Sequence, residues 1–327
     1  MEVADQRILA VAERMAAPLR VAVRGRPGVG RRTVAAALDR VGGPAGLTVA
    51  TEPPAQGAEL QVYVIAEVAK PEDADAGATL GVLNKADLGG FARGDNPITA
   101  AGARCVDFAE LVGAPMLPMS GLLAVAAFEG FDATSWAALR ELAADPGGLA
   151  SLDGGFDGFL TAQFAVPVRE RQRLLRVLDL FGLALAVAAV RRGAGPGGVR
   201  AILRRVSGVD AIVQRLVVAG AQQRYRRVLD AIAELEVLAI GDARIGAFLS
   251  SDDTAAARMA AAIDLAQAQE LELGPTAPLQ RAVHWQRYRR TAAVDLHRAC
   301  AAEITRGSLR LWSRAGGVPV RDGREAR

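Results

Sequence analysis

Four consecutive residues, Asn84-Lys85-Ala86-Asp87, carry side chains that suit recognition of a purine base. A fixed carboxylate at Asp87 would accept hydrogen bonds from both N1–H and the exocyclic amine of guanine, a pair of donors that adenine does not offer. The asparagine would tie its loop and face the base, and the lysine stem would cover the plane of the ring. The chain contains only two lysines and two asparagines, so composition alone does not explain this tetrad. The spacing predicts guanine binding by Asn84, Lys85 and Asp87.

A glycine-rich stretch, Gly25–Thr33, has the spacing of a phosphate-binding loop. It reads GRPGVGRRT, follows an apolar run and precedes a helical pattern. Glycines allow main-chain N–H groups to turn toward a phosphate at the start of the following helix. The residues predicted to contact phosphate are Gly25, Gly28, Gly30, Arg31, Arg32 and Thr33.

Along the chain, the glycine-rich stretch comes first and Asn84–Asp87 follows. Two motifs in this order resemble those of Era- and dynamin-like GTPases, most of all the bacterial dynamin-like proteins of actinobacteria. In that family a G domain lies between an N-terminal helix and a long helical region, and its base-reading motif is N-K-x-D. The resemblance extends to Met119-Ser120-Gly121-Leu122, which follows a later apolar run where the family has a loop whose N–H reaches guanine O6. It covers about residues 19–125 and adds Ser120 and Gly121 to the guanine site.

The residues at the positions where the family binds phosphate and Mg²⁺ depart from the family pattern. Arg31 stands in place of the lysine, and Arg32 cannot supply the hydroxyl that holds Mg²⁺. Thr33 is one position late for that task. The family's D-T-P-G aligns best with Thr51-Glu52-Pro53-Pro54, where the metal-side aspartate has become threonine and the glycine has become a proline without an N–H.

The segment after the glycine loop is also short. Between Thr33 and Leu47 there is room for one helix and a turn, but not for a strand carrying a switch loop with its Mg²⁺-binding threonine. Phosphoryl transfer needs metal, lysine and water-positioning groups together. The resemblance therefore implies a degenerate site, without catalytic residues and without an expected magnesium ion, that either binds GDP or GTP weakly or is a structural relic in which Asn84 and Asp87 only cap their loop.

The elements around these motifs alternate between strand and helix in the first half of the chain. Apolar β-prone runs lie at 19–25, 46–51, 60–66, 79–83 and 114–119, with helical stretches near 32–41 and 98–112. This alternation predicts a parallel sheet covered on both faces. After about residue 155 helical periodicity takes over. The predicted fold is an α/β P-loop sheet, G-domain-like and truncated, followed by an all-α helical bundle.

The predicted organisation has four parts. A helix at 1–18 packs on the bundle, a degenerate GTPase-like domain spans 19–147, the bundle spans 148–312, and 313–327 form a flexible tail. A chain of 327 residues suits two domains.

Composition bears on where the protein works. Cys105 and Cys300 give neither a disulfide framework nor a zinc spacing, which fits a reducing compartment. No apolar run reaches 18 residues without a charge, and the N-terminus carries charges throughout, so neither a secretory signal nor a membrane span is expected. We expect a cytoplasmic protein, with peripheral contact to the inner face of the cell membrane as an open alternative.

The favoured function is that of a catalytically impaired GTPase homologue, a pseudo-GTPase. Dynamin-like proteins work as dimers across their nucleotide faces, so the resemblance implies a partner from the GTPase family, as a hetero- or homodimer, in which this chain is a subunit or regulator of an active GTPase. One alternative is an active GTPase in which Arg31 replaces lysine and Thr33 rotates onto Mg²⁺. Arginine is a poorer fit there, because its planar fork is bulkier than an ammonium group.

A second alternative is an adaptor for an anionic surface. The last 47 residues hold 11 basic and 4 acidic side chains, and 281–314 mixes arginines with Trp285, Tyr288 and Trp312. Such a mixture suits an anionic membrane, whereas nucleic acid is not the expected partner. We favour the ordinary reading, an amphipathic helix with arginines outside and a core of Trp285, Val294, Leu296 and Ile304.

Overall fold

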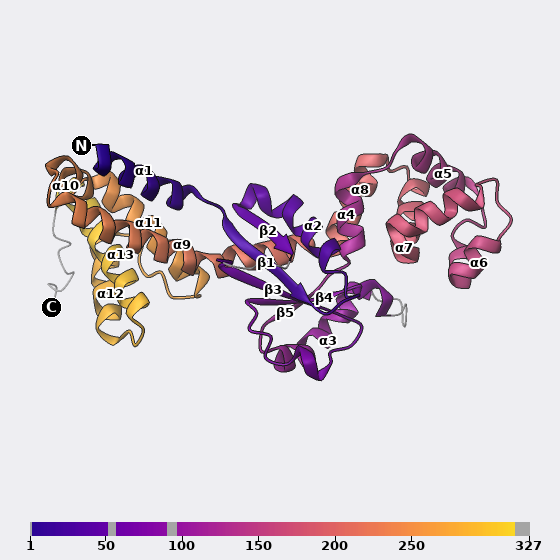
Figure 1. Ribbon diagram of the computed structural model, residues 1–327, viewed down its shortest axis with the longest axis horizontal. Helices are drawn as coiled ribbons and strands as arrows, with labels where there is room; N and C mark the ends of the chain where they lie inside the picture. Colours follow the sequence, from indigo (N-terminus) through magenta and orange to yellow (C-terminus); the bar gives the residue numbers. More distant parts are fainter. Residues whose placement is uncertain (1, 52–56, 90–96, 318–327) are drawn as a thin grey trace, which may run out of the picture. The chain divides into compact units, whose positions relative to one another are not determined.

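The protein is described by a computed structural model that covers residues 2–51, 57–89 and 97–317 and that divides into two compact units (Figure 1). One unit is Pro18–Val217, and the other combines Met1–Ala17 with Val218–Arg327. The first unit extends past residue 147, where the sequence predicted a boundary, and includes the helical residues up to Val217. The N-terminal residues up to Ala17 group with the later helices.

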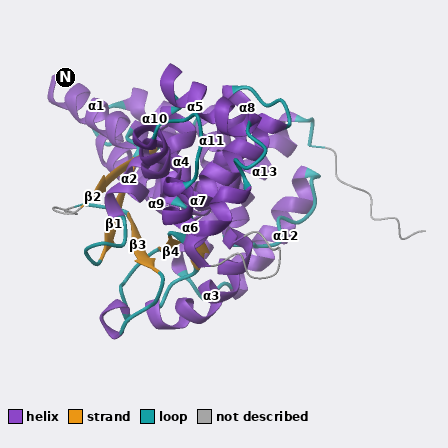
Figure 2. Ribbon diagram, turned by 90° about the vertical axis from the view of Figure 1, so that its right-hand side faces the viewer, coloured by secondary structure: helices purple, strands orange, loops and turns teal. Residues whose placement is uncertain are grey.

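A five-stranded, fully parallel sheet forms the centre of the first unit (Figure 2). Its strand order is β2-β1-β3-β4-β5, and Val23 of β1 pairs with Thr51 on one side and Val62 on the other. The strands β1 to β5 span Leu19–Gly25, Leu47–Thr51, Leu60–Ala66, Leu80–Asn84 and Met116–Pro118. The five predicted strands are confirmed to within two residues at either end.

Helices cover both faces of this sheet, which explains why its strands are almost continuously apolar. All five residues of β4 are buried. Helices α2 (Arg31–Gly42) and α4 (Gly121–Glu129) pack against each other on one face, whereas α3 (Pro97–Val112) packs on β4 and β5 from the other (Figure 1). The crossovers therefore bring the loops that follow the strands to one edge of the sheet.

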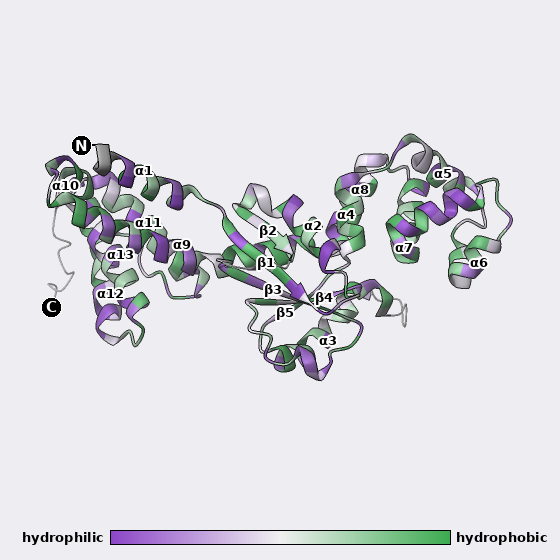
Figure 3. Cartoon of the chain, viewed as in Figure 1, coloured by the Kyte–Doolittle hydropathy of each residue, from purple (hydrophilic) through white to green (hydrophobic). Residues whose placement is uncertain are grey.

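The remaining helices of this unit extend the same hydrophobic core. Apolar residues make up nearly all of α4, which contacts both α7 and α8 (Figure 3). Leu83 of the sheet, Leu123 of α4 and Leu178 of α7 belong to one buried cluster. The remaining helices, α5 to α8, span Ala133–Ala144, Gly155–Thr161, Val168–Arg191 and Pro196–Ser207.

The second unit is all helical. Its core contains Tyr225, Trp285, Cys300 and Ile304, each at most 1% exposed. The helices are α1, α9, α10, α11, α12 and α13, spanning Glu2–Ala16, Val209–Ala239, Ala243–Leu249, Asp252–Ala268, Pro278–Thr291 and Asp295–Arg314, and α9 starts within the first unit.

The basic segment 281–314 forms two helices, α12 and α13, rather than one. Trp285 and Ile304 are core residues as expected, but Val294 is 51% exposed because it lies in the break and caps the second helix. The core expectation for Val294 was therefore wrong.

The structure bears only in part on two expectations, the absence of a membrane span and a flexible tail at 313–327. No single helix of the described residues is long and apolar enough to cross a membrane, and the one helix pair that would pass by composition, α4 with α5, is bent by 115°. Helix α13 continues to Arg314, and residues 318–327 of the predicted tail lie outside the described residues.

Candidate functional site

The predicted site residues meet at the carboxyl ends of β1, β4 and β5. From β1 the chain leads to β2 on one side of the sheet, while β3 lies on the other side, so the strand order reverses next to β1. In open parallel sheets ligands bind in the crevice outside such a reversal. The glycine loop leaves the sheet at this point, between Gly25 and Arg31.

Glycine is required in this loop because the backbone has positive φ and close neighbours. The φ angles of Gly25, Gly28 and Gly30 are 143°, 84° and 87°. A Cβ atom at Gly25 would lie 2.3 Å from the carbonyl oxygen of Val64, and one at Gly30 would lie 2.4 Å from Nδ2 of Asn84. The glycine spacing seen in the sequence therefore corresponds to a loop that lies tightly against β3 and Asn84.

Asn84 joins three loops of the site. Its Nδ2 donates to the carbonyl oxygen of Val29 at 2.8 Å, and its Oδ1 accepts from the main-chain N–H of Gly121 at 2.9 Å. The residue is 3% exposed. A buried amide with both ends hydrogen-bonded fixes the loops after β1, β4 and β5 relative to one another. The tying role expected for Asn84 matches this geometry.

Asp87 lies one short turn beyond Asn84, in the 3-10 helix Ala86–Gly89, and is 5% exposed. Burial raises the pKa of its carboxyl above the usual 3.8, and the nearby carboxylate of Asp179 adds to this, whereas the Ser120 hydroxyl and the main-chain N–H of Asp87 oppose it. A buried carboxyl with a raised pKa gains from any ligand that supplies N–H donors. Lys85, half-buried with φ of 54°, directs the turn between the two residues.

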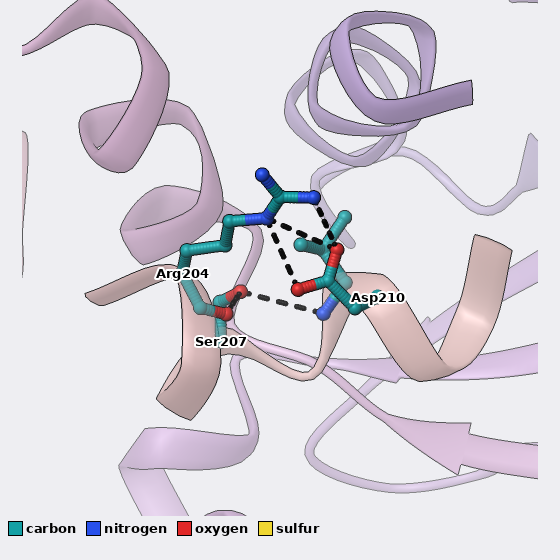
Figure 4. Close-up of polar contacts among 4 residues, drawn as sticks. Arg204, Ser207 and Asp210 are labelled. Atoms are coloured by element: carbon teal, nitrogen blue, oxygen red, sulfur yellow. Dashed lines mark hydrogen bonds and ion pairs between the residues drawn. The ribbon is translucent and has the colours of Figure 1, made fainter. Parts of the chain in front are cut away.

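The loop after β5 is held by the turn between α8 and α9. The N–H of Ser120 donates to the carbonyl oxygen of Ser207 at 2.9 Å. Ser207 in turn donates to the carbonyl oxygen of Arg204, and Arg204 forms an ion pair with Asp210 at 2.8 Å (Figure 4). The Ser120 hydroxyl is fully buried, and it lowers the pKa of the Asp87 carboxyl from a position that lacks the geometry of an ordinary hydrogen bond.

The three residues after Gly30, which were predicted to contact phosphate, differ in their exposure. Arg31, Arg32 and Thr33 occupy the first turn of α2; Arg32 is exposed, and Arg31 and Thr33 are half-buried. The methyl group of Thr33 lies against the start of α4, 3.4 Å from where a Cβ of Gly121 would be. The described residues contain no cluster of three or more metal-ligating side chains. Thr51 ends β2, while Glu52, Pro53 and Pro54 lie outside the described residues.

Comparison of the chain with protein-family models, with curated proteins and with solved structures found no match. The properties of the site therefore rest on its own geometry.

A second network, not predicted from the sequence, holds the glycine loop from the other side. Asp73 is completely buried and accepts from Nε of Arg26 at 2.8 Å, from the Tyr63 hydroxyl at 2.9 Å and from the N–H of Lys70 at 2.8 Å. Arg26 also donates to the carbonyl oxygen of Val68. Although burial alone would raise the pKa of Asp73, these hydrogen bonds outweigh it and hold the pKa below its usual value.

Asp73→Ala is expected to lower the free energy of unfolding by about 3 kcal/mol, because Arg26 and Tyr63 would lose their shared acceptor. The low pKa in the folded state makes this contribution fully present near neutral pH, and it is lost as the pH falls through that pKa. Urea unfolding at several pH values measures the effect. Glu72→Ala, an exposed change in the same turn, is the control, and equal stability of the two variants at pH 7 would contradict the prediction.

Proposed function

We propose that this protein binds guanine nucleotides through a degenerate G-domain-like site and does not hydrolyse them. The observation that carries the proposal is the buried bridge from Asn84 to Val29 and Gly121, which unites the glycine loop with the two loops predicted to read the base. Strand order alone would suit other mononucleotides as well. The bridge, with Asp87 beside it, is what favours guanine.

The base would be selected by Asp87. Its carboxylate is nearly buried and close to a second carboxylate, Asp179, so its ionised form lacks adequate stabilisation in the free protein. The N1–H and amino groups of guanine supply two donors to it, whereas adenine presents an unprotonated N1 at the same place. The N–H of Gly121 is already used by Asn84, and the Ser120 hydroxyl lies beside the Asp87 carboxyl.

The phosphates would lie in the glycine loop at the start of α2. Three backbone positions with positive φ and a helix N-terminus favour an anion there, and Arg31 adds a positive charge at the same end. Arg32 replaces the hydroxyl that would hold Mg²⁺ in a G domain, and the Thr33 side chain packs toward α4. These residues support binding of a diphosphate or triphosphate but not a metal-dependent hydrolysis.

Such a protein would act through whether a nucleotide is bound at its site, and not through hydrolysis of that nucleotide. The resemblance to dynamin-like GTPases supports a role as a subunit or regulator that pairs with an active GTPase. The purified chain should then change the GTP hydrolysis rate of that partner, and this change should depend on Asp87.

Calorimetric titration of the full chain with GDP and GTP, with and without Mg²⁺, tests the proposal. Binding should be saturable, insensitive to Mg²⁺ and abolished by Asp87→Ala, while Asp107→Ala, an exposed aspartate on α3, should bind as wild type. ADP and FMN should bind more weakly than GDP. Absence of binding at millimolar GDP would overturn the proposal, and so would GTP turnover above background, which would support an active GTPase.

The affinity for GDP is expected to fall as the pH is lowered through the raised pKa of Asp87. Protonation removes an acceptor that guanine needs, so the nucleotide competes with the proton for this carboxyl. Titrations from pH 8 down to the lowest pH at which the protein stays folded measure the change. The phosphate groups of GDP also take up protons as the pH falls, so Asp87→Ala serves as the control. Only the part of the pH dependence that this variant lacks belongs to Asp87, and identical profiles would contradict the assignment.

A further inference from the structure

A large apolar cavity lies within the helical unit, separate from the nucleotide site. Its volume is about 910 Å³, and its walls come from α1, α9, α10 and α11. This volume is within the range of about 300–1,000 Å³ that is typical of small-molecule sites. The lining is dominated by aliphatic side chains, and Phe248 is the only aromatic residue among the described residues that line it.

Two of the walls are helix stripes with the same periodicity. Helix α1 contributes Ile8, Val11, Ala12 and Met15, and α9 contributes Val228, Ala231, Ile232 and Leu235. Both sets follow the i, i+3, i+4, i+7 spacing of an apolar face that needs a covering partner. The two stripes border a common space, so an apolar occupant would complete the burial of both. Leu9 of α1 is 60% exposed and does not line the cavity.

Helix α1 is held along this cavity mainly by polar contacts. Arg14 forms an ion pair with Glu234 of α9, and Arg227 donates to the carbonyl oxygen of Ala17 just after α1. Val11 is 5% exposed, whereas Met15 is 41% exposed. The helix is thus anchored at its edges and leaves room between its apolar stripe and α9.

Four charged side chains line the cavity: Asp242, Arg244, Arg258 and Asp264. Asp242 forms an ion pair with Arg244 at 2.6 Å. Arg258 donates through Nη2 to Glu303 at 2.6 Å, but its Nε is buried and has no hydrogen-bond partner within the described residues.

Arg306 also contacts the carboxylate of Glu303, at 3.1 Å. Two guanidinium groups therefore share one carboxylate, which leaves a positive charge and a spare N–H donor on a side chain, Arg258, that is only 11% exposed. A buried donor without a partner is costly. Charge balance at this point favours an anionic acceptor.

A second unpartnered polar group lies nearby. The hydroxyl of Tyr225 is buried without a hydrogen-bond partner in the described residues, and Arg258 is close enough to influence its pKa. Tyr225 lines a smaller cavity of about 190 Å³, which shares Met15, Val228, Ala261 and Asp264 with the larger one. The polar side chains of Arg258, Tyr225 and Asp264 therefore border this part of the apolar space.

We propose that this cavity binds one long-chain fatty acid, with its alkyl chain against the stripes of α1 and α9 and its carboxylate beside the guanidinium group of Arg258, which lines the cavity. A flexible alkyl chain suits an aliphatic wall better than a flat ring does. The carboxylate neutralises the excess charge at Arg258 and Arg306, and the site is independent of the proposed nucleotide binding.

Calorimetric titration of the delipidated full-length protein with oleate, below its micelle concentration, tests the cavity. Ala257→Trp places a large side chain at an exposed position of the lining, and Ala256→Trp places the same side chain on the neighbouring exposed position outside it. We expect Ala257→Trp to weaken oleate binding by at least tenfold, with Ala256→Trp and Asp87→Ala unchanged. No saturable binding, or equal binding by both tryptophan variants, would overturn the proposal.

Oleyl alcohol, which has the same chain without the carboxylate, tests the role of Arg258. Wild type should bind oleate roughly tenfold more tightly than the alcohol, and Arg258→Gln should remove this preference while it retains alcohol binding, which also shows that the variant is folded. Equal affinities for both ligands in wild type would overturn the carboxylate assignment. Light scattering completes the test: if Ala257→Trp dissociates an oligomer without any effect on oleate binding, the cavity is a protein contact and the proposal is wrong.

Discussion

Asp87→Asn is expected to exchange the base preference of the site from guanine to xanthine. Xanthine keeps the N1–H donor but carries an oxygen where guanine has its amino group. A carboxamide accepts from N1–H and donates to that oxygen, whereas the wild-type carboxylate would face it with a second acceptor. We expect GDP affinity to fall and XDP affinity to rise, each by roughly 100-fold, because each mismatch leaves a buried charged or polar group unpaired.

Competition titrations of GDP and XDP against both proteins measure this exchange. A gain of XDP binding cannot arise from general damage to the fold, which is the advantage of this variant over Asp87→Ala. Asp107→Asn, at an exposed position of α3, should keep the wild-type preference. Loss of GDP binding without any gain for XDP would show that Asp87 supports the loop but does not read the base.

The same substitution should stabilise the nucleotide-free protein near neutral pH. Burial raises the pKa of Asp87, so the folded state binds a proton more tightly than the unfolded state and loses stability as the pH rises through that pKa. The neutral amide avoids this penalty. The difference in unfolding free energy between the two proteins should therefore shrink as the pH is lowered.

Local patterns in the sequence were sufficient to predict the part of the site that depends on backbone geometry. The apolar runs before Gly25 and Asn84 predict strands, and in a parallel sheet the residues that follow such strands share one edge. The glycine spacing predicted a tight loop before a helix, and the structure has such a loop, with positive φ at Gly25, Gly28 and Gly30. The tying role of Asn84 was also predictable, because an amide is the side chain that donates and accepts at once.

Contacts between distant residues could not be predicted in the same way. Arg26 and Asp73 are 47 positions apart, and the charged residues around each look like ordinary surface positions in the sequence. The turn Lys-Pro-Glu-Asp signals a bend but not its partner. The contact of Ser120 with Ser207 likewise depends on how α8 packs on α4, which no periodicity specifies.

Periodicity also identifies an apolar face without showing what covers it. The sequence predicts that the helix at 1–18 packs on the bundle, but it does not predict the cavity between α1 and α9. For the same reason Val294 looked like a core residue: it is apolar and lies at helical spacing, yet the helix breaks there. The grouping of the helices after residue 147 with the sheet follows from the apolar surface of α4, which packs on α7 and α8 within the same buried cluster.

Asn84→Asp is expected to cause the largest loss of stability, about 3–5 kcal/mol near neutral pH. The change preserves shape but replaces the Nδ2 donor with a carboxylate oxygen 2.8 Å from the carbonyl oxygen of Val29, at a position that is 3% exposed. Two acceptors would then face each other in a buried place. GDP binding should be lost as well, because the glycine loop would no longer be tied to the loops after β4 and β5.

Acidification should reverse much of this loss, because a protonated carboxyl can again donate to Val29. Burial favours the neutral form in the folded state, so the introduced group takes up a proton on folding and the stability of the variant rises as the pH falls. Asn84→Leu, which removes both hydrogen bonds without adding a charge, should show a deficit that does not depend on pH. Urea unfolding at pH 5 and pH 7 separates the two cases. A deficit of Asn84→Asp that is the same at both pH values would mean that the Val29 carbonyl does not depend on the Asn84 donor, and the bridge would then lose its place as the feature that unites the site.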